Sequence, residues 1–197
     1  MNRTFVTTVI AVVIAIVAVG VFSTTLVHAV WYAPDPEVAT PAPYAAATSS
    51  APARLIIPVL NINANVQQVG IKVDGSMGTP NNFTDVAWYK LGSQPGQLGS
   101  AVIDGHVDNG LSLAGVFKHL SDIKIGDDVY VQEKDGSKLH FVVIDIESYP
   151  YQNAPAGKVF NRSDKARLNL ITCEGTWVPS QKTYEQRLVV FTELSPT

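Results

Sequence analysis

Residues 127–149 read DDVYVQEKDGSKLHFVVIDIESY, and this stretch decides the fold class. Two runs rich in Val, Ile, Phe and Tyr, at 127–134 and 138–149, flank the dipeptide Asp135-Gly136. Asp-Gly is favoured in tight hairpin turns because such turns need residues that adopt positive φ angles. The stretch therefore predicts a β-hairpin.

Further short β-like runs lie on both sides of this hairpin. They cover 54–58, 66–73, 100–106, 167–173 and 187–194. Turn residues such as Asp74-Gly75 separate them, and helical pattern is scarce, with SLAGVFKHL at 112–120 as the best short candidate. Many short strands at this spacing predict a mostly β domain at 54–197, folded as a closed or nearly closed antiparallel barrel or a sandwich.

The amino-terminal segment has a different character. No Asp, Glu, Lys or Arg occurs from Thr4 to Pro34, a length that exceeds the roughly 20 apolar residues of a membrane-spanning helix. Arg3 precedes the apolar stretch, which favours a cytoplasmic amino terminus. We expect residues 1–32 to be a cytoplasmic stub and a single-pass transmembrane anchor in the cell membrane, with the folded domain outside the cytoplasm.

A cleaved signal peptide is the alternative for this segment, since Val27-His28-Ala29 resembles a small-residue cleavage site. The apolar run is longer than the roughly 7–15 residues of a signal-peptide core, which favours the anchor. Residues 33–53 are rich in Pro, Ala, Ser and Thr and predict an extended tether. Both alternatives place the domain outside the cytoplasm.

Charge and cysteine content limit the classes of function that this chain can have. The 197-residue chain has a net charge of -3 and no Lys/Arg stripe, so no nucleic-acid partner is expected. Cys173 is its one cysteine and has no partner for an internal disulfide. A lone thiol in an exported protein is either intermolecular or reactive.

Three residues at predicted strand ends form a candidate catalytic set. Cys173 ends the run 167–173, and His106 follows the apolar strand within AVIDGHVDNG. Arg187 begins the run 187–194, so antiparallel pairing with 167–173 brings it beside Cys173 across the connection 174–186. Histidine carries protons near neutral pH, and a guanidinium stabilises an oxyanion.

Each of these residues also has an unremarkable interpretation when taken alone. Cys173 suits a buried structural thiol, His106 a loop histidine and Arg187 a solvated strand start. Asp108 suits a turn-capping aspartate, with orientation of His106 as the alternative. The combination of thiol, imidazole and guanidinium indicates a nucleophilic cysteine site.

The local sequences around these residues resemble those of sortases, the cysteine transpeptidases of Gram-positive cell surfaces. Leu170-Ile171-Thr172-Cys173 resembles their Leu-x-Thr-Cys signature, Gly105-His106-Val107-Asp108 their histidine segment, and Arg187 their arginine. Ile57-Pro58 and Trp88-Tyr89 also look like sortase. Cys173-Glu174-Gly175 and the compact domain are most similar to the class F or class E groups.

The resemblance implies a barrel of about eight strands and a definite reaction. A Leu-Pro-x-Thr-Gly-like sorting peptide is cleaved between Thr and Gly through a thioacyl intermediate on Cys173. His106 protonates the leaving amine, Arg187 stabilises the oxyanion, and the acyl group passes to a cell-wall amine. The expected substrate contacts are Thr172, Val159 and Trp177, and no metal or other cofactor is expected.

Two alternatives to this function remain open. The first is a membrane-tethered β-barrel binding module whose cysteine is not catalytic. The second is another exported cysteine enzyme, such as an L,D-transpeptidase or an endopeptidase. Those enzymes resemble Ser-His-Gly-Cys or Asp-Cys-Ser-Gly around the thiol, and neither sequence occurs here.

Overall fold

The computed structural model describes residues 13–19, 21, 50–109, 111 and 113–196. Residues 13–19 and 21 are helical. The remainder of the expected anchor 1–32, and the expected tether up to residue 49, lie outside the described residues. Within the described part of the chain, no helix has the length and apolar character needed to cross a membrane.

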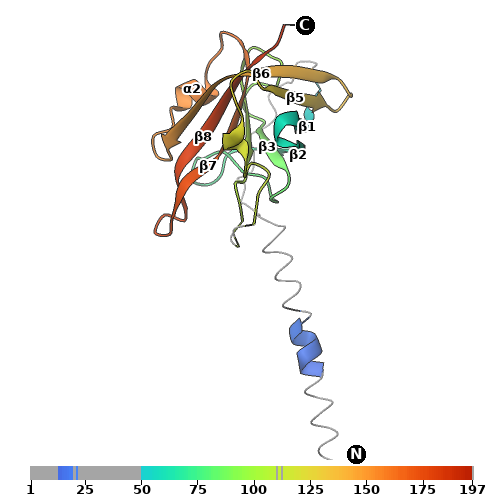
Figure 1. The fold of residues 1–197 in the computed structure, drawn as a ribbon, viewed down its shortest axis with the longest axis vertical. Coiled ribbons are helices and arrows are strands. Elements are labelled where there is room, and N and C mark those ends of the chain that lie inside the picture. Colours follow the sequence, from blue (N-terminus) through green and yellow to red (C-terminus); the bar gives the residue numbers. More distant parts are fainter. Residues whose placement is uncertain (1–12, 20, 22–49, 110, 112, 197) are drawn as a thin grey trace, which may run out of the picture.

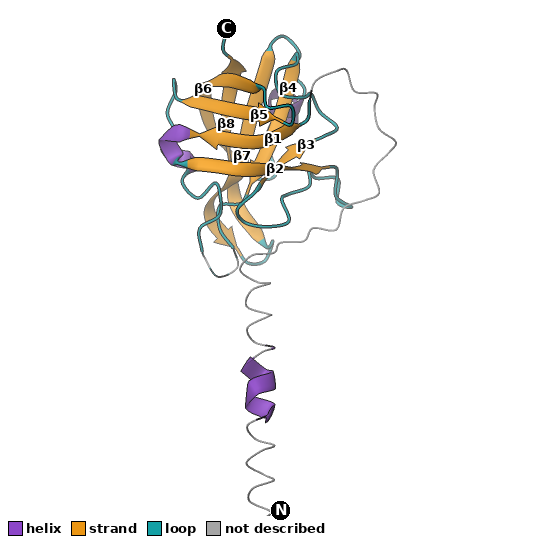
Figure 2. Ribbon diagram, turned by 90° about the vertical axis from the view of Figure 1, so that its right-hand side faces the viewer, coloured by secondary structure: helices purple, strands orange, loops and turns teal. Residues whose placement is uncertain are grey.

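The described part of the domain is a closed barrel of eight strands in the order β1-β2-β3-β4-β7-β8-β6-β5 (Figures 1 and 2). The strands are β1 (Pro52–Ile57), β2 (Ile62–Val69), β3 (Val86–Tyr89), β4 (Gly99–Gly105), β5 (Asp128–Glu133), β6 (Lys138–Pro150), β7 (Ala166–Val178) and β8 (Thr183–Leu194). The helices are short: the 3₁₀ turns η1 (Pro58–Leu60) and η2 (Leu120–Asp122), and α2 (Ala156–Phe160).

The barrel is mixed, which corrects the prediction of an antiparallel one. Among the described strands, β2 pairs with β3 and β4 with β7 in parallel. Parallel neighbours need long crossover connections. Residues 70–85 supply the first crossover, and the second runs through β5 and β6. The remaining neighbours around the barrel are antiparallel.

The hairpin predicted at Asp135-Gly136 is present as β5 and β6. The Asp135 carboxylate accepts hydrogen bonds from the backbone N–H and the hydroxyl of Ser137, at 2.9 and 2.7 Å. Gly136 has a φ angle of 90°, which glycine adopts without steric cost. Local turn chemistry therefore accounts for this part of the fold.

The helix predicted at 112–120 is wrong. The described residues of this stretch form turns and an isolated bridge, and the 3₁₀ turn η2 begins only at Leu120. Backbone N–H groups of Gly115 and Phe117 donate to the carbonyls of Val107 and His106. The stretch therefore packs its backbone against the end of β4 and forms only single turns of its own, such as the bond from the N–H of Lys118 to the carbonyl of Gly115.

The core divides into two clusters on opposite sides of the sheet. Side chains alternate along a strand, so Leu168 and Leu170 of β7 face the barrel interior, where they pack with residues such as Phe141. Val189 and Phe191 of β8 belong to a separate outer cluster with Val102, Val159 and Ile171. The helix α2 supplies Val159 to this outer cluster. Cys173, two residues beyond Ile171, continues the outward-facing set.

Candidate active site

Cys173 and Arg187 are direct partners in the β7–β8 ladder. The predicted antiparallel pairing of the two runs is therefore confirmed. Both strands extend further than expected, because β7 continues to Val178 and β8 starts at Thr183. The connection is the short turn 179–182 and not the long segment 174–186.

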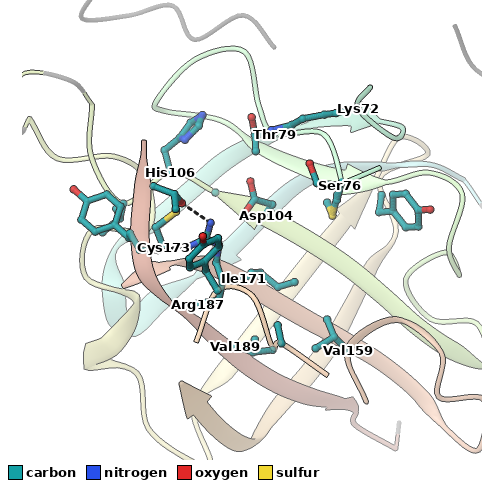
Figure 3. Close-up of a pocket in the computed structure, with 18 of the residues that line it drawn as sticks. Lys72, Ser76, Thr79, Asp104, His106, Val159, Ile171, Cys173, Arg187 and Val189 are labelled. Atoms are coloured by element: carbon teal, nitrogen blue, oxygen red, sulfur yellow. Dashed lines mark hydrogen bonds between the residues drawn. The ribbon is translucent and has the colours of Figure 1, made fainter. Parts of the chain in front are cut away.

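His106 reaches the same end of the barrel through the parallel pairing of β4 with β7. The register aligns Asp104 with Ile171, and His106 and Cys173 each lie two residues beyond this pair. His106 immediately follows the end of β4, whereas Cys173 is still within β7. Figure 3 shows His106, Cys173 and Arg187 gathered at one end of a pocket whose other end holds Val159 and Val189.

This pocket is a groove of about 1030 Å³ on the outer face of the barrel. Its lining residues come from six places: the floor formed by β4, β7 and β8, Tyr89 at the end of β3, the crossover 71–83, residues 106–109 after β4, the segment 151–161 containing α2, and the β7–β8 hairpin. Ile171 and Val189 give the floor beside Cys173 and Arg187 an apolar part, and Asp104 of β4 adds a carboxylate next to Ile171. The arrangement suits an extended chain that lies with one carbonyl near the sulfur.

The His106 ring is held at the edge of the groove. Its Nε2 lies 3.0 Å from the carbonyl oxygen of Pro80, and its ring centroid is 4.9 Å from that of Phe83. A carbonyl only accepts, so this contact requires a proton on Nε2. Among the described residues, no hydrogen bond joins His106 to Cys173. The thiol and the imidazole are thus separate groups that share one groove.

The Arg187 guanidinium is fixed by its own hairpin. Nη1 donates to the carbonyls of Tyr184 and Gln186 at 3.2 and 2.9 Å, and Nη2 donates to the Thr183 hydroxyl at 2.7 Å. The guanidinium carbon lies 5.7 Å from the centroid of the Tyr151 ring. A guanidinium held in this way presents a fixed positive charge to the groove.

The electrostatic surroundings of Cys173 favour the neutral thiol. Burial raises the pKa of Cys173, and the Arg187 guanidinium opposes that rise. The carboxylates of Asp104 and Asp108 raise the same pKa further. The reactive thiolate is therefore a minor species at neutral pH.

The structure brings two of the three expected substrate contacts to the groove. Val159 and Trp177 line it, although Val159 is 1% exposed and Trp177 is 48% exposed. Thr172 is not among the groove-lining residues, because alternation along β7 turns it inward. Its buried hydroxyl donates to the carbonyl of Gly105 at 2.8 Å and ties β7 to the end of β4.

One whole wall of the groove, the crossover 71–83, was not predicted from the sequence. Lys72, Met77 and Phe83 of this segment line the groove. The backbone N–H of Lys72 donates to the carbonyl of Ser76 at 2.8 Å, and this turn contains the Asp74-Gly75 signal. The turn was recognisable from the sequence, but its position over Cys173 depends on the parallel pairing of β2 with β3.

In the residues that the structure describes, no group of three or more His, Cys, Asp or Glu side chains is placed to hold a metal ion. The chemistry available in the groove is that of a thiol, an imidazole and a guanidinium.

Comparison with known proteins places the whole barrel in one family. The family model described as a sortase domain matches residues 55–195. Sortase A from Corynebacterium diphtheriae superposes with a TM-score of 0.58 and 21% identity, over 75% of this chain and 61% of that one. Sortase C-1 from Actinomyces oris superposes with a TM-score of 0.56 and 25% identity, over 73% of each chain.

Sortase C from Clostridium perfringens SM101 gives a TM-score of 0.55 and 20% identity, over 74% of this chain and 70% of that one. No curated protein sequence gives a significant match. This chain thus spans less than two thirds of the Corynebacterium enzyme, and the likenesses below 25% identity show the fold alone. Because the family model covers most of the chain, the protein belongs to the sortase family of cysteine transpeptidases.

Proposed function

We propose that this protein cleaves a Leu-Pro-x-Thr-Gly-like sorting peptide between Thr and Gly and transfers the acyl group to a cell-wall amine. The observation that carries the proposal is the direct pairing of Cys173 with Arg187 in a groove that His106 also lines. A binding module with an incidental thiol has no need for this combination. Family membership supports the same reaction class.

In the first half-reaction, the Cys173 thiolate attacks the carbonyl carbon of the substrate Thr and forms a C–S bond. The Arg187 guanidinium stabilises the negative charge that develops on the carbonyl oxygen. His106, as the imidazolium, gives its proton to the Gly nitrogen as the C–N bond breaks. The products are a thioester on Cys173 and a free Gly amine.

In the second half-reaction, an amine of a cell-wall precursor attacks the thioester carbonyl. The proton of the attacking nitrogen passes to His106, and Cys173 leaves as the thiolate when the new amide forms. Water in place of the amine gives hydrolysis. The raised pKa of Cys173 keeps the reactive thiolate scarce between turnovers.

The peptide occupies the groove in an extended conformation. The Leu and Pro side chains lie on the apolar floor formed by Ile171 and Val189, where burial of apolar surface stabilises them. Val159 and Trp177 flank this floor, and the scissile carbonyl lies near the sulfur of Cys173.

The placement of the enzyme in the cell follows from the sequence. Residues 1–32 anchor the chain in the membrane, and the segment that follows tethers the domain. The catalytic domain lies outside the cytoplasm and begins with β1 at Pro52, two residues before the predicted boundary at 54. This location puts the groove beside surface proteins and cell-wall precursors. Membership of class F or class E stays a prediction.

Intact mass spectrometry of the full chain in detergent micelles, incubated with a Leu-Pro-x-Thr-Gly peptide, tests the reaction. We expect an adduct of the mass of the acyl fragment on the parent protein and none on Cys173→Ala. Hydroxylamine should release the adduct as the hydroxamate. A parent protein that binds the peptide but forms no adduct would support the binding-module alternative.

A further inference from the structure

Asp108 and Tyr184 are joined by a hydrogen bond that spans 76 positions of the sequence. The Tyr184 hydroxyl lies 2.6 Å from both carboxylate oxygens of Asp108. Asp108 is two residues after His106, and Tyr184 is three residues before Arg187. The contact therefore connects the segment that carries His106 with the hairpin that carries Arg187.

Other side chains hold both partners in place. The ring of Trp177 packs edge-on against Tyr184 with the centroids 5.3 Å apart, and Lys118 Nζ lies 3.5 Å from a carboxylate oxygen of Asp108. Burial and the bond to Asp108 raise the pKa of Tyr184 to about 12, so its hydroxyl stays a donor across the physiological range. The backbone carbonyl oxygen of Tyr184 also accepts a hydrogen bond from the Arg187 guanidinium.

The contact lies at the point where the strand pairing stops. In the parallel ladder between β4 and β7 the last registered pair is Asp104 with Ile171, and β4 ends at Gly105. From His106 on, the ladder no longer fixes the chain relative to Cys173. Asp108 and Tyr184 line both the groove and a smaller cavity of about 120 Å³ that also reaches Cys173.

We infer that Asp108 and Tyr184 are positioning residues that fix the distance between His106 and the Cys173–Arg187 pair. Both carboxylate oxygens of Asp108 face Tyr184, and among the described residues no hydrogen bond joins Asp108 to the His106 ring. Asp108 therefore acts through the opposite hairpin and not by orienting the imidazole directly. The inference rests on the proposed function, because it assigns a role toward the proton donor of that reaction.

The rate of thioacyl formation in a single turnover tests the inference. Tyr184→Phe removes only the hydroxyl, and Asp108→Asn removes the charge at nearly constant shape. A small misplacement of a catalytic group lowers rates by about 10- to 100-fold, and we expect a loss of this size for each variant. The peptide concentration for half-maximal rate should change by less than about twofold, since neither substitution alters the groove floor.

Two controls separate a positioning role from a general loss of structure at the site. They are the variant that carries both substitutions, and the alkylation of Cys173 by a small electrophile. Because the two residues act through one contact, the double variant should lose no more than the worse single variant. Alkylation of Cys173 by iodoacetamide needs no proton from His106, so in Tyr184→Phe it should stay within about twofold of the parent rate. In Asp108→Asn it should rise, because the Asp108 carboxylate raises the pKa of Cys173. Additive losses, a parent-like Tyr184→Phe, or an equal fall in alkylation would each overturn the inference.

A spectroscopic readout keeps the inference separate from the reaction itself. The NMR signals of the His106 ring, assigned with His106→Gln, should shift in Tyr184→Phe while those of His140 stay unchanged. Tyr130→Phe is the reciprocal control, because the Tyr130 ring stacks on His140 at 4.8 Å and lies outside the groove. Unchanged His106 signals in Tyr184→Phe reject the positioning role. Shifted signals in a protein that forms no acyl adduct reject the proposed function alone.

Discussion

Cys173 and Arg187 face each other across an antiparallel ladder, so the hydrogen-bond register of two strands fixes the separation of sulfur and guanidinium. A slip of one residue in that register would turn one of the two side chains to the opposite face of the sheet. Leu170 and Val190, a buried pair three positions away along the same ladder, make such a slip costly. The pair is therefore part of the fold and does not depend on a flexible loop.

Arg187→Ala should lower the rate constant for thioacyl formation by about 10²- to 10³-fold, the loss typical of one removed oxyanion donor. Arg187→Lys should recover only a small part of it, because an ammonium lacks the planar fork of donors. Quenched-flow mass spectrometry of the adduct measures both rates. Arg162→Ala, on a residue outside the groove that pairs with Asp164, serves as the control. A fully active Arg187→Lys would contradict the oxyanion role.

His106→Gln should lower the rate of peptide acylation by about 10²- to 10⁴-fold, because the leaving amine then lacks its proton donor. Alkylation of Cys173 by iodoacetamide should persist, since that reaction has a halide leaving group. Parallel time courses with peptide and with iodoacetamide provide the comparison. Equal losses in the two reactions would mean that His106 acts on the thiol or on the fold instead.

The alkylation of Cys173 should rise with pH throughout the neutral range. Burial raises the pKa of the thiol, so the thiolate fraction grows about tenfold per pH unit until the pH reaches that pKa. The midpoint should lie above about 8.5, the ordinary value for cysteine. Arg187→Ala should move it higher still, because the guanidinium lowers this pKa. A rate that levels off below pH 7 would contradict the environment described here.

Gly115→Ala should displace His106. A Cβ atom at Gly115 would lie 2.3 Å from the carbonyl oxygen and 2.7 Å from the carbonyl carbon of His106, and neither backbone atom can rotate away. We expect a loss of about 1–3 kcal/mol in the free energy of unfolding, as for other overpacked sites, together with slower acylation. Gly157→Ala, where a Cβ meets nothing within 4 Å, is the matched control. Urea denaturation and adduct formation measure the two effects.

Lys158→Met should weaken peptide binding more than it slows acylation at saturation. Lys158 of α2 binds the carboxylates of Asp145 and Glu147 on β6, and its ammonium lies 4.5 Å from the centroid of the Phe191 ring. The hydrogen bond from Lys158 lowers the pKa of Glu147 to about 2, so this link weakens only when the pH falls from the ordinary range of a glutamate toward 2. Without it, α2 loses one of its ties to the barrel, while the buried Val159 stays packed in the outer cluster.

The measurement for Lys158→Met is the peptide dependence of the acylation rate at neutral pH. We expect the half-saturating concentration to rise several-fold, with the maximal rate within about twofold of the parent. Lys138→Met removes a cation that lies over Tyr130 on β5, so it controls for the change in net charge. A reduced maximal rate with unchanged saturation would place the effect on the chemistry and not on the groove wall.

Much of the barrel is encoded in local sequence. The β5–β6 hairpin follows from Asp135-Gly136, and the pairing of β7 with β8 follows from two apolar runs separated by a turn-rich stretch. That pairing alone was enough to predict Arg187 beside Cys173. The outward direction of Cys173 required only the alternation of side chains along β7.

The rest depends on partners that are distant in the chain. Strand β3 has four residues, too few for a periodic signal, and it pairs in parallel with β2. The groove wall at 71–83 and the contact of Asp108 with Tyr184 arise only when the barrel closes. Gly115 looks like a tolerable helix residue in the sequence, but its backbone packs against His106.

The parallel alignment of β4 with β7 also determines whether the barrel can reassemble after its backbone is cut. The excursion through β5 and β6 leaves the reactive end after β4 and rejoins the sheet at the opposite end, where Ala166 pairs with Gly99. The ladder from Gly99–Ala166 to Asp104–Ile171 then brings β7 back to the reactive end. A cut in the turn at 134–137 would leave two fragments, each carrying part of the reactive set and each incomplete as a barrel. We expect these fragments to recover thiol-dependent acylation only when they are mixed, so that fragment complementation itself becomes a sensor of barrel closure.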